Sequence, residues 1–156
     1  MTLHLMASRR EWLRKTGLIG ALAAAAALVP RLALAAWNKA AFDGKTLADA
    51  YKAMGVDAPK ESPEVQIVAS DIAENGAVVP VQAVSKLPNT TQISFLVEKN
   101  PNMLAALFDL GPDAVPDVTT RIKMGQTSNV IALVKADGKF YTATKEIKVT
   151  LGGCGG

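Results

Sequence analysis

The chain has 156 residues, of which 49% are hydrophobic, enough for one domain with a packed core. Its formal net charge of +3 arises in residues 1–35, which hold five of the 17 Lys and Arg and one of the 14 Asp and Glu, so the remaining 121 residues carry −1. A nucleic-acid surface with clustered Lys and Arg is therefore excluded, and because the single histidine is His4, Ser-His or Cys-His catalysis by residues 36–156 alone is excluded too.

Residues 1–35 have the order of regions that is typical of an export signal. The basic stretch SRREWLRK at 8–15 resembles the twin-arginine type, an uncharged apolar run follows at 17–30, and a small-x-small cleavage site ends at Ala35. A membrane anchor would need about 20 apolar residues, and this run is shorter. We therefore expect a bacterial signal that is cleaved after Ala35, a folded protein delivered to the periplasm, and no membrane segment after cleavage.

The first element predicted after the signal is a helix at 46–54, where apolar residues recur at helical spacing. Thr46 and Asp49 match a capping box at its start, and Gly55 suits the left-handed residue that ends a helix. Beyond Pro59 the pattern changes to short segments rich in Val, Ile, Thr and Phe, separated by Gly, Pro and Asn. This change predicts strands for the rest of the chain.

The predicted strands follow one another at intervals of about ten residues, as in an antiparallel sandwich. Alternation is clearest at 120–124, where Ile122 and Met124 are expected to face inward. The strands are predicted at 65–69, 77–84, 92–97, 103–110, 118–124, 129–134, 140–143 and 146–149. The fold class is therefore expected to be all-β, an antiparallel β-sandwich with a short N-terminal helix.

Two dipeptides between these segments are strong turn signals, Asn75-Gly76 and Asp137-Gly138. Asn, Asp and Gly tolerate the left-handed backbone that tight turns require. We therefore expect the chain to reverse direction at both positions.

No pattern in residues 36–156 predicts a metal or cofactor site. Three aspartates are spaced four apart, but Pro112 and Pro116 break any helix that would place them on one face, so a solvated loop is expected. Three methionines at apolar positions are expected to fill the core rather than to bind copper. The aspartates are Asp109, Asp113 and Asp117, and the methionines are Met54, Met103 and Met124.

The last five residues, Gly152-Gly153-Cys154-Gly155-Gly156, surround the only cysteine with four glycines. A lone cysteine in an exported protein cannot form an internal disulfide, so it is free, paired with another chain or carrying a group. Glycine has no Cβ, so the segment is predicted to be a flexible arm of minimal cross-section whose thiol can enter a narrow pocket of another protein. We expect a β-rich domain at 36–151 and a swinging arm at 152–156, with Cys154 as its reactive residue.

The arm, the twin-arginine signal and the β-rich domain together resemble the SoxY family, the sulfur carriers of the bacterial thiosulfate-oxidising Sox system. Similar internal stretches are IAENGAVVPV at 72–81, VEKNPNMLAALFDL at 97–110 and TRIKMGQTSNV at 120–130. The resemblance implies an immunoglobulin-like β-sandwich and a carrier without enzymatic activity or cofactor, which holds sulfur intermediates covalently on Cys154. It also implies a heterodimer with SoxZ and transient partners, namely the c-type cytochrome SoxXA, the hydrolase SoxB and the sulfane dehydrogenase SoxCD.

Two other functions remain open for the cysteine. A periplasmic enzyme that used Cys154 as its own nucleophile would need a base and an oxyanion site, and residues 36–156 contain no histidine. An exported β-sandwich binding module would use Cys154 only for an intermolecular disulfide. A carrier predicts sulfane or thiosulfonate adducts on Cys154, whereas the binding module predicts only a dimer or a free thiol.

Overall fold

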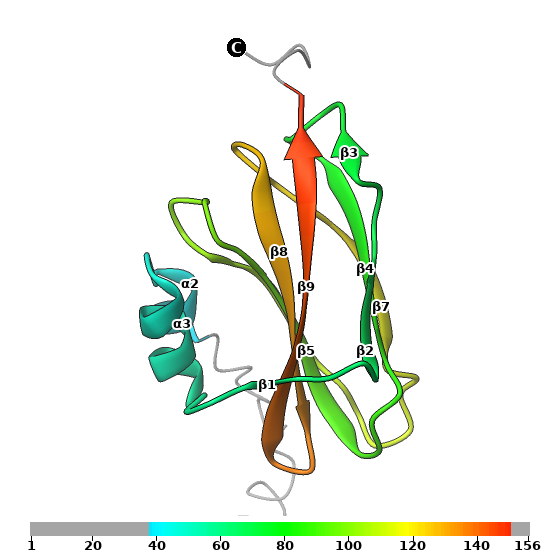
Figure 1. The fold of residues 1–156 in the computed structure, drawn as a ribbon. Helices are drawn as coiled ribbons and strands as arrows, with labels where there is room; N and C mark the ends of the chain where they lie inside the picture. Colours follow the sequence, from blue (N-terminus) through cyan, green and yellow to red (C-terminus); the bar gives the residue numbers. More distant parts are fainter. Residues whose placement is uncertain (1–37, 151–156) are drawn as a thin grey trace, which may run out of the picture. The chain divides into compact units, whose positions relative to one another are not determined.

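The computed structural model describes residues 38–150, which form two short helices and two β-sheets (Figure 1). The predicted signal at 1–35 and the predicted arm at 152–156 lie outside the described residues. The helices are α2 (Lys39–Phe42) and α3 (Leu47–Met54). The strands are β1 (Lys60–Glu61), β2 (Val65–Val68), β3 (Ile72–Ala73), β4 (Val79–Ser85), β5 (Thr90–Val97), β6 (Leu104–Asp109), β7 (Asp117–Ile122), β8 (Ser128–Ala136) and β9 (Lys139–Val149).

Helix α3 begins and ends where the sequence predicts. The Thr46 hydroxyl accepts a hydrogen bond from the Asp49 backbone N–H at 3.1 Å and donates one to the Asp49 carboxylate at 2.7 Å. At the other end Gly55 is left-handed, with φ of 70°. Helix α2 was not predicted, because its single turn of four residues is too short to show helical periodicity.

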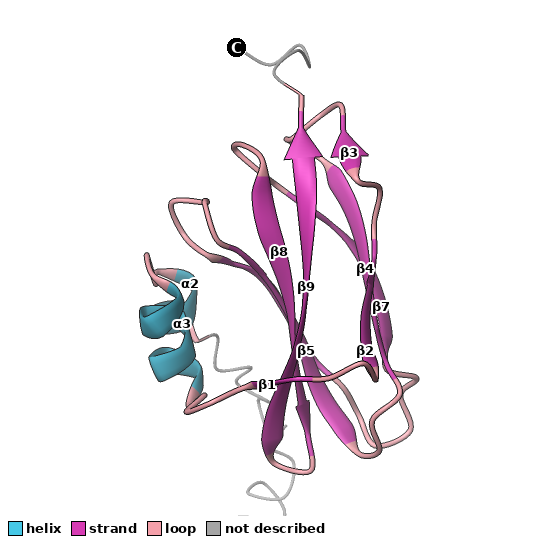
Figure 2. Cartoon of the chain, viewed as in Figure 1, coloured by secondary structure: helices cyan, strands magenta, loops and turns pink. Residues whose placement is uncertain are grey.

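The strands form two sheets that pack face to face (Figure 2). The larger sheet has the order β1-β9-β8-β5-β6, with β3 also paired to β9, and the smaller sheet has the order β2-β4-β7. Neighbouring strands are antiparallel except β1 and β3, which both run parallel to β9. The predicted all-β, immunoglobulin-like β-sandwich is therefore confirmed, with two short parallel additions.

The prediction of separate strands at 140–143 and 146–149 is wrong, because these residues belong to the single strand β9. Thr144 and Lys145 pair with Ile131 and Val130 of β8, so the ladder is continuous. These two polar residues interrupt the apolar pattern, but neither supplies the turn chemistry that would end a strand. The strands β1 and β3 were not predicted at all, since two residues cannot display alternation.

The dipeptide Asp137-Gly138 forms the hairpin turn between β8 and β9, as predicted. Asp137 has φ of 49° and Gly138 has φ of 73°, and Ala136 pairs with Lys139 directly across the turn. Positive φ at both central residues is the geometry of a type I′ turn, whose twist matches that of the flanking strands. The turn fixes the register with which β9 pairs along β8.

Two apolar cores stabilise the described part of the chain. The larger lies between the two sheets, where Ile122 and Met124 are buried as predicted, with 4% and 2% of their surface exposed. The smaller lies between the larger sheet and the helices, where Leu96 and Leu133 pack with Ala50 of α3. The strands β5 and β8 are thus buried on both faces, which explains their nearly continuous apolar sequence.

The three aspartates spaced four apart are exposed, but only Asp113 lies in a loop. Asp109 ends β6 and accepts a hydrogen bond from the Gln92 side chain, and Asp117 begins β7 and accepts one from the Gln82 side chain. The prediction of a solvated loop is therefore correct for the middle aspartate and wrong for the outer two. The two strands extend up to these residues because each aspartate has a cross-strand amide partner.

Candidate functional site

The candidate site lies at the end of β9, because this strand leads to the predicted arm. Cys154 and the glycines Gly152, Gly153, Gly155 and Gly156 lie outside the described residues. The structure describes the chain as far as Thr150, four residues before Cys154. Residues 148–150, here called the arm root, leave the fold beside β3 (Figure 1). The fold therefore determines the position from which the arm starts.

Strand β3 holds one side of the arm root. It runs parallel to β9, with Ile72 opposite Lys148 and Ala73 opposite Val149. The Lys148 N–H donates to the Asp71 carbonyl at 2.9 Å, and the Thr150 N–H donates to the Ala73 carbonyl at 3.1 Å. These bonds continue the sheet to Thr150, the last residue that the structure describes.

A threonine side chain holds the other side of the arm root. The backbone pairing of β8 with β9 stops at Ser128 and Ile147, so β8 cannot supply a partner for Val149. The Thr127 hydroxyl oxygen accepts a hydrogen bond from the Val149 N–H at 3.0 Å and lies 3.5 Å from the Val149 carbonyl, to which it donates. A side chain thus replaces the missing backbone partner, as buried or half-buried backbone groups require.

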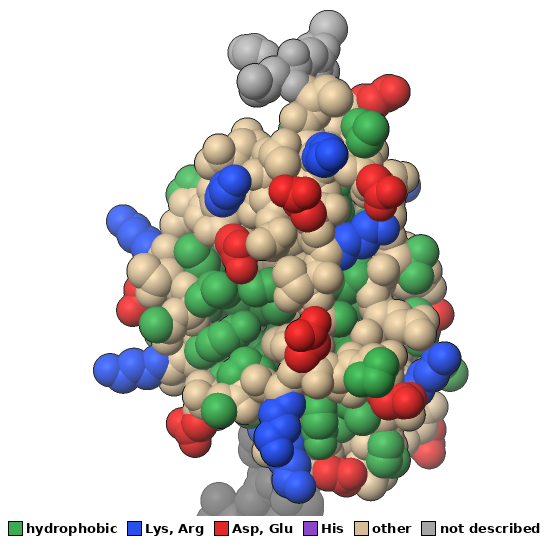
Figure 3. All heavy atoms as spheres, viewed as in Figure 1, with side chains coloured by type: hydrophobic (Ala, Val, Ile, Leu, Met, Phe, Trp, Pro, Cys, Tyr) green, Lys and Arg blue, Asp and Glu red, His purple; other side chains and the backbone are tan. Residues whose placement is uncertain are grey.

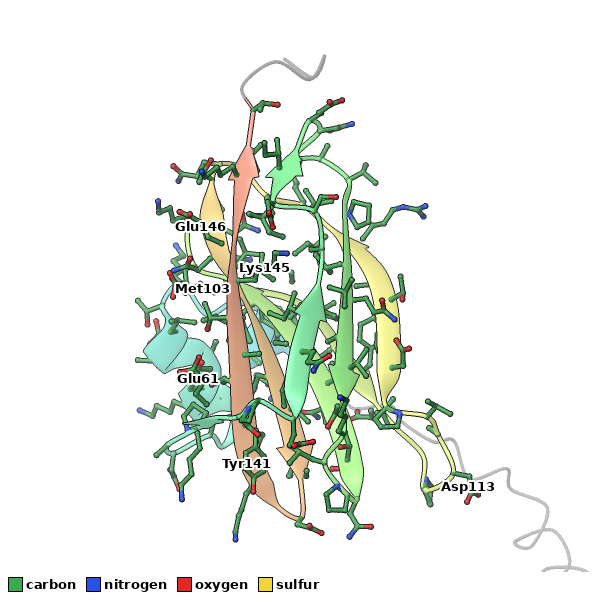
Figure 4. All side chains as sticks on the ribbon, turned by 45° about the vertical axis from the view of Figure 1, so that its right-hand side comes forward. Glu61, Met103, Asp113, Tyr141, Lys145 and Glu146 are labelled. Atoms are coloured by element: carbon green, nitrogen blue, oxygen red, sulfur yellow. The ribbon has the colours of Figure 1, made fainter. Side chains whose placement is uncertain are left out.

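An ion pair fixes the segment that precedes β3. The side chain of Lys145 on β9 is labelled in Figure 4. Its ammonium lies 2.9 Å from the Asp71 carboxylate and donates to the Ala69 carbonyl at 2.6 Å. The hydrogen bond and the charge of Lys145 hold the pKa of Asp71 below its usual range. Because the folded pKa is lowered, the pair stabilises the fold above the usual pKa of aspartate, and this contribution is lost as the pH falls through the folded pKa.

The predicted turn at Asn75-Gly76 lies against the arm root. The Asn75 side chain accepts from the Ala77 N–H at 2.9 Å, and the Gly76 carbonyl accepts from the Met124 N–H at 2.7 Å. A Cβ added to Gly76 would collide with the Met124 carbonyl oxygen and would lie 2.8 Å from Cγ1 of Val149. The turn is confirmed, and its glycine permits close approach of the backbone rather than a left-handed φ.

Gly76→Ala is therefore expected to lower the free energy of unfolding by about 1–3 kcal/mol, because the added methyl group must displace backbone atoms. The matched control is Gly111→Ala, since no atom lies within 4 Å of a Cβ at that position and its φ is not left-handed. Urea denaturation of both variants measures the difference. Equal stability of the two variants would show that the contact between Gly76 and Met124 does not constrain the fold.

One pocket of the described residues is too far from the arm root for Cys154 to reach it. A pocket of about 200 Å³ lies between the end of α3 and the β8–β9 hairpin. It is at the start of β9, where its lining residue Tyr141 lies nine residues before Thr150, or about 30 Å along an extended strand. Cys154 is four residues beyond Thr150 and reaches at most about 14 Å from it. The thiol of the same chain therefore cannot reach this pocket.

Within residues 38–150, no three His, Cys, Asp or Glu side chains gather closely enough to hold a metal ion. Neither helix of the described part is long and apolar enough to cross a membrane.

Sequence reasoning predicts Cys154 and the glycines around it as the site, but it missed the residues that hold the arm root. Thr127 lies between Gln126 and Ser128 in a polar stretch, and no local pattern distinguishes a threonine that binds a strand end from one that faces water. The Ile72-Ala73 pair is too short to be recognised as a strand. The roles of Thr127 and of Ile72-Ala73 both depend on contacts with β9, which is distant from them in sequence. The Asn75-Gly76 turn is the one local sequence signal near these residues.

Several solved structures are similar to this chain, whereas a comparison with curated proteins gave no match. The sulfur carrier protein SoxY from Chlorobium limicola f thiosulfatophilum is 41% identical, covers 68% of this chain and 97% of its own, and superimposes with a TM-score of 0.61. A superoxide reductase (neelaredoxin) from Ignicoccus hospitalis is 22% identical, with coverage of 55% of this chain and 80% of its own and a TM-score of 0.50. The second similarity concerns the fold alone.

The sequence pattern of the family described as sulfur oxidation protein SoxY matches residues 50–154. The match begins in α3, includes the whole β-sandwich and ends at Cys154. With 41% identity to a solved SoxY over more than two thirds of the chain, the two comparisons agree. The chain therefore belongs to the SoxY family of sulfur oxidation proteins.

Proposed function

We propose that the chain is a covalent carrier that holds sulfur intermediates on Cys154 and presents them to partner enzymes during thiosulfate oxidation. The observation that carries the proposal is the family match, which extends through residue 154 and so includes the cysteine of the glycine-rich tail. The solved relative at 41% identity is itself a sulfur carrier protein. The arm root adds a physical argument, because a tethered thiol needs a fixed starting point.

Loading, the covalent attachment of thiosulfate to the carrier, takes place at the Cys154 thiol. Thiosulfate and the Cys154 thiol join through a new S–S bond, which releases one proton and two electrons to the c-type cytochrome SoxXA. Water then cleaves the terminal sulfone as sulfate through the hydrolase SoxB, which leaves a persulfide on the cysteine. Where it is present, the sulfane dehydrogenase SoxCD oxidises this remaining sulfur. The carrier supplies the attachment atom, and each partner supplies the catalytic groups.

The partners and the compartment complete the proposal. The twin-arginine signal at 1–35 would deliver the folded chain to the periplasm, where a heterodimer with SoxZ would form. The glycines on either side of Cys154 keep the arm narrow, so that the thiol can enter the active sites of successive partners. No step requires a cofactor bound to this chain.

The intact mass of the native chain, measured before and after reductant, tests the carrier function. In cells that oxidise thiosulfate, we expect adducts of sulfane sulfur or thiosulfonate that reductant removes. The alternative is an exported binding module whose cysteine forms an intermolecular disulfide. That module would give only a dimer that reductant converts to monomer, or an unmodified thiol, and either result alone would contradict the proposal.

A further inference from the structure

We propose that the surface around the arm root docks the enzymes that act on the sulfur held by Cys154. This proposal rests on the carrier function and adds the place of contact. The surface, here called the root face, consists of the arm root together with Ile72 on β3 and Val78 before β4. Its occupant would be the apolar rim of an enzyme's active-site channel.

The first argument is the length of the arm. Cys154 is four residues from Thr150, and an extended chain spans at most about 3.3–3.6 Å per residue, so the sulfur stays within about 14 Å of the arm root. An active site that receives this sulfur inside a channel must open within that distance. The channel mouth therefore has to lie against the residues that surround the arm root.

The second argument is the apolar surface at this position. Of the large hydrophobic side chains in residues 38–150, four are exposed, and two of them are Ile72 at 56% and Val78 at 48%. The other two are Val68 and Val115. A single exposed valine needs no explanation, because such residues are common on protein surfaces. Two of these four residues lie beside the arm root, where the rim of an enzyme's channel would contact the carrier.

Both residues are tied to the arm root by the contacts that hold it. Ile72 is the partner of Lys148 in the β3–β9 pair. The Val78 N–H donates to the Asn75 carbonyl at 3.3 Å, which closes the turn whose Gly76 lies against Met124 and Val149. The turn and β3 therefore present the two apolar side chains at fixed positions beside the arm root. A surface that is rigid before binding loses little entropy on docking.

The charges around the root face favour an apolar contact over electrostatic attraction. Asp71, Glu74, Lys123 and Lys148 are exposed in the adjoining segments, and they carry both signs. Figure 3 shows a hydrophobic side chain over β3 with acidic and basic side chains near it. An apolar centre within a mixed polar rim is the usual composition of a transient protein interface. The partner is therefore expected to present apolar side chains rather than a strongly acidic or basic surface.

The test compares turnover of three carriers by the sulfate-releasing hydrolase. The first is the mature chain with its SoxZ subunit, the second is the same complex with Ile72→Thr and Val78→Thr, and the third is a synthetic peptide of residues 147–156. Each is loaded with tetrathionate, from which the Cys154 thiolate displaces thiosulfate and keeps a thiosulfonate. Threonine retains the β-branched shape, so the fold should be preserved. Val115→Thr is the matched control, because Val115 is 77% exposed in the loop of Asp113, far from the arm root (Figure 4).

We expect the hydrolase to have its lowest KM for the wild-type complex. For the double variant we expect a KM roughly tenfold higher than for wild type, closer to that of the peptide, and a kcat that is little changed. The control should match wild type. Equal KM for peptide and complex, or for double variant and wild type, would overturn the docking proposal while leaving the carrier function intact. Loss of SoxZ from the double variant would also overturn it, since the two residues would then belong to the subunit interface. Sulfate release from none of the carriers would overturn the proposed function itself.

Discussion

Cys154→Ser is expected to abolish thiosulfate-dependent sulfur loading and to leave thermal unfolding of the chain unchanged. Serine differs by one atom, but its hydroxyl is a far poorer nucleophile towards sulfur than a thiolate. Within the described residues, both apolar clusters are built from side chains of the helices and the sandwich, so we expect the substitution to leave them intact. Thiosulfate oxidation by a system reconstituted with the proposed Sox partners measures the loss of loading. Calorimetry of the same preparation measures thermal unfolding.

The wild-type chain alkylated at Cys154 is the control for this substitution, because it blocks the same atom without changing the gene. It should be as inactive as the serine variant. Full thiosulfate oxidation by either protein would show that sulfur is not carried on this cysteine.

Replacing both Gly153 and Gly155 with valine should slow enzymatic loading of Cys154 by roughly 100-fold. The β-branched side chains restrict the backbone and widen the arm on both sides of the thiol, and a misfit of about an ångström in a positioned reaction costs this much. Reaction with a small alkylating reagent should stay close to wild type, because the thiol remains exposed. Both rates are measured on one preparation, with SoxXA as the loading enzyme.

The control for the arm variant is Gly111→Val, which adds the same side chain at an exposed loop position where no atom lies within 4 Å of a Cβ. It should load at the wild-type rate. If the double arm variant loaded equally fast, the glycines would not be needed for access to the partner's active site, and the narrow-arm explanation of this tail would be wrong.

Elements with strong local signals were predictable from the sequence. Helix α3 has its cap at Thr46 and its stop at Gly55, and the hairpin of β8 and β9 has the Asp137-Gly138 turn. In both cases the determining interactions lie within a few residues of each other. The alternation that buries Ile122 and Met124 is equally local, because the period of a strand is two residues.

Elements that depend on distant partners were not predictable. Strand β3 is a strand only because β9 lies parallel to it, and its pairing joins residues 76 positions apart. The continuity of β9 through Lys145 depends on β8 and on Asp71, which neutralises the half-buried ammonium. Thr127 acquires its role only where the backbone pairing of β8 has ended. The anchoring of the arm root is thus a tertiary property, whereas the cysteine that we propose as the attachment site is visible in the sequence itself.

The central claim is that Cys154 is the atom to which sulfur becomes attached, and fragmentation mass spectrometry of the C-terminal peptide tests it most directly. The proposed complex with SoxZ is exposed to isotopically labelled thiosulfate and to SoxXA, the proposed loading enzyme, and is then digested without reductant. The account predicts a labelled thiosulfonate on Cys154, converted to a labelled persulfide when SoxB is added. An unmodified Cys154 peptide from a preparation that is oxidising thiosulfate would contradict the account.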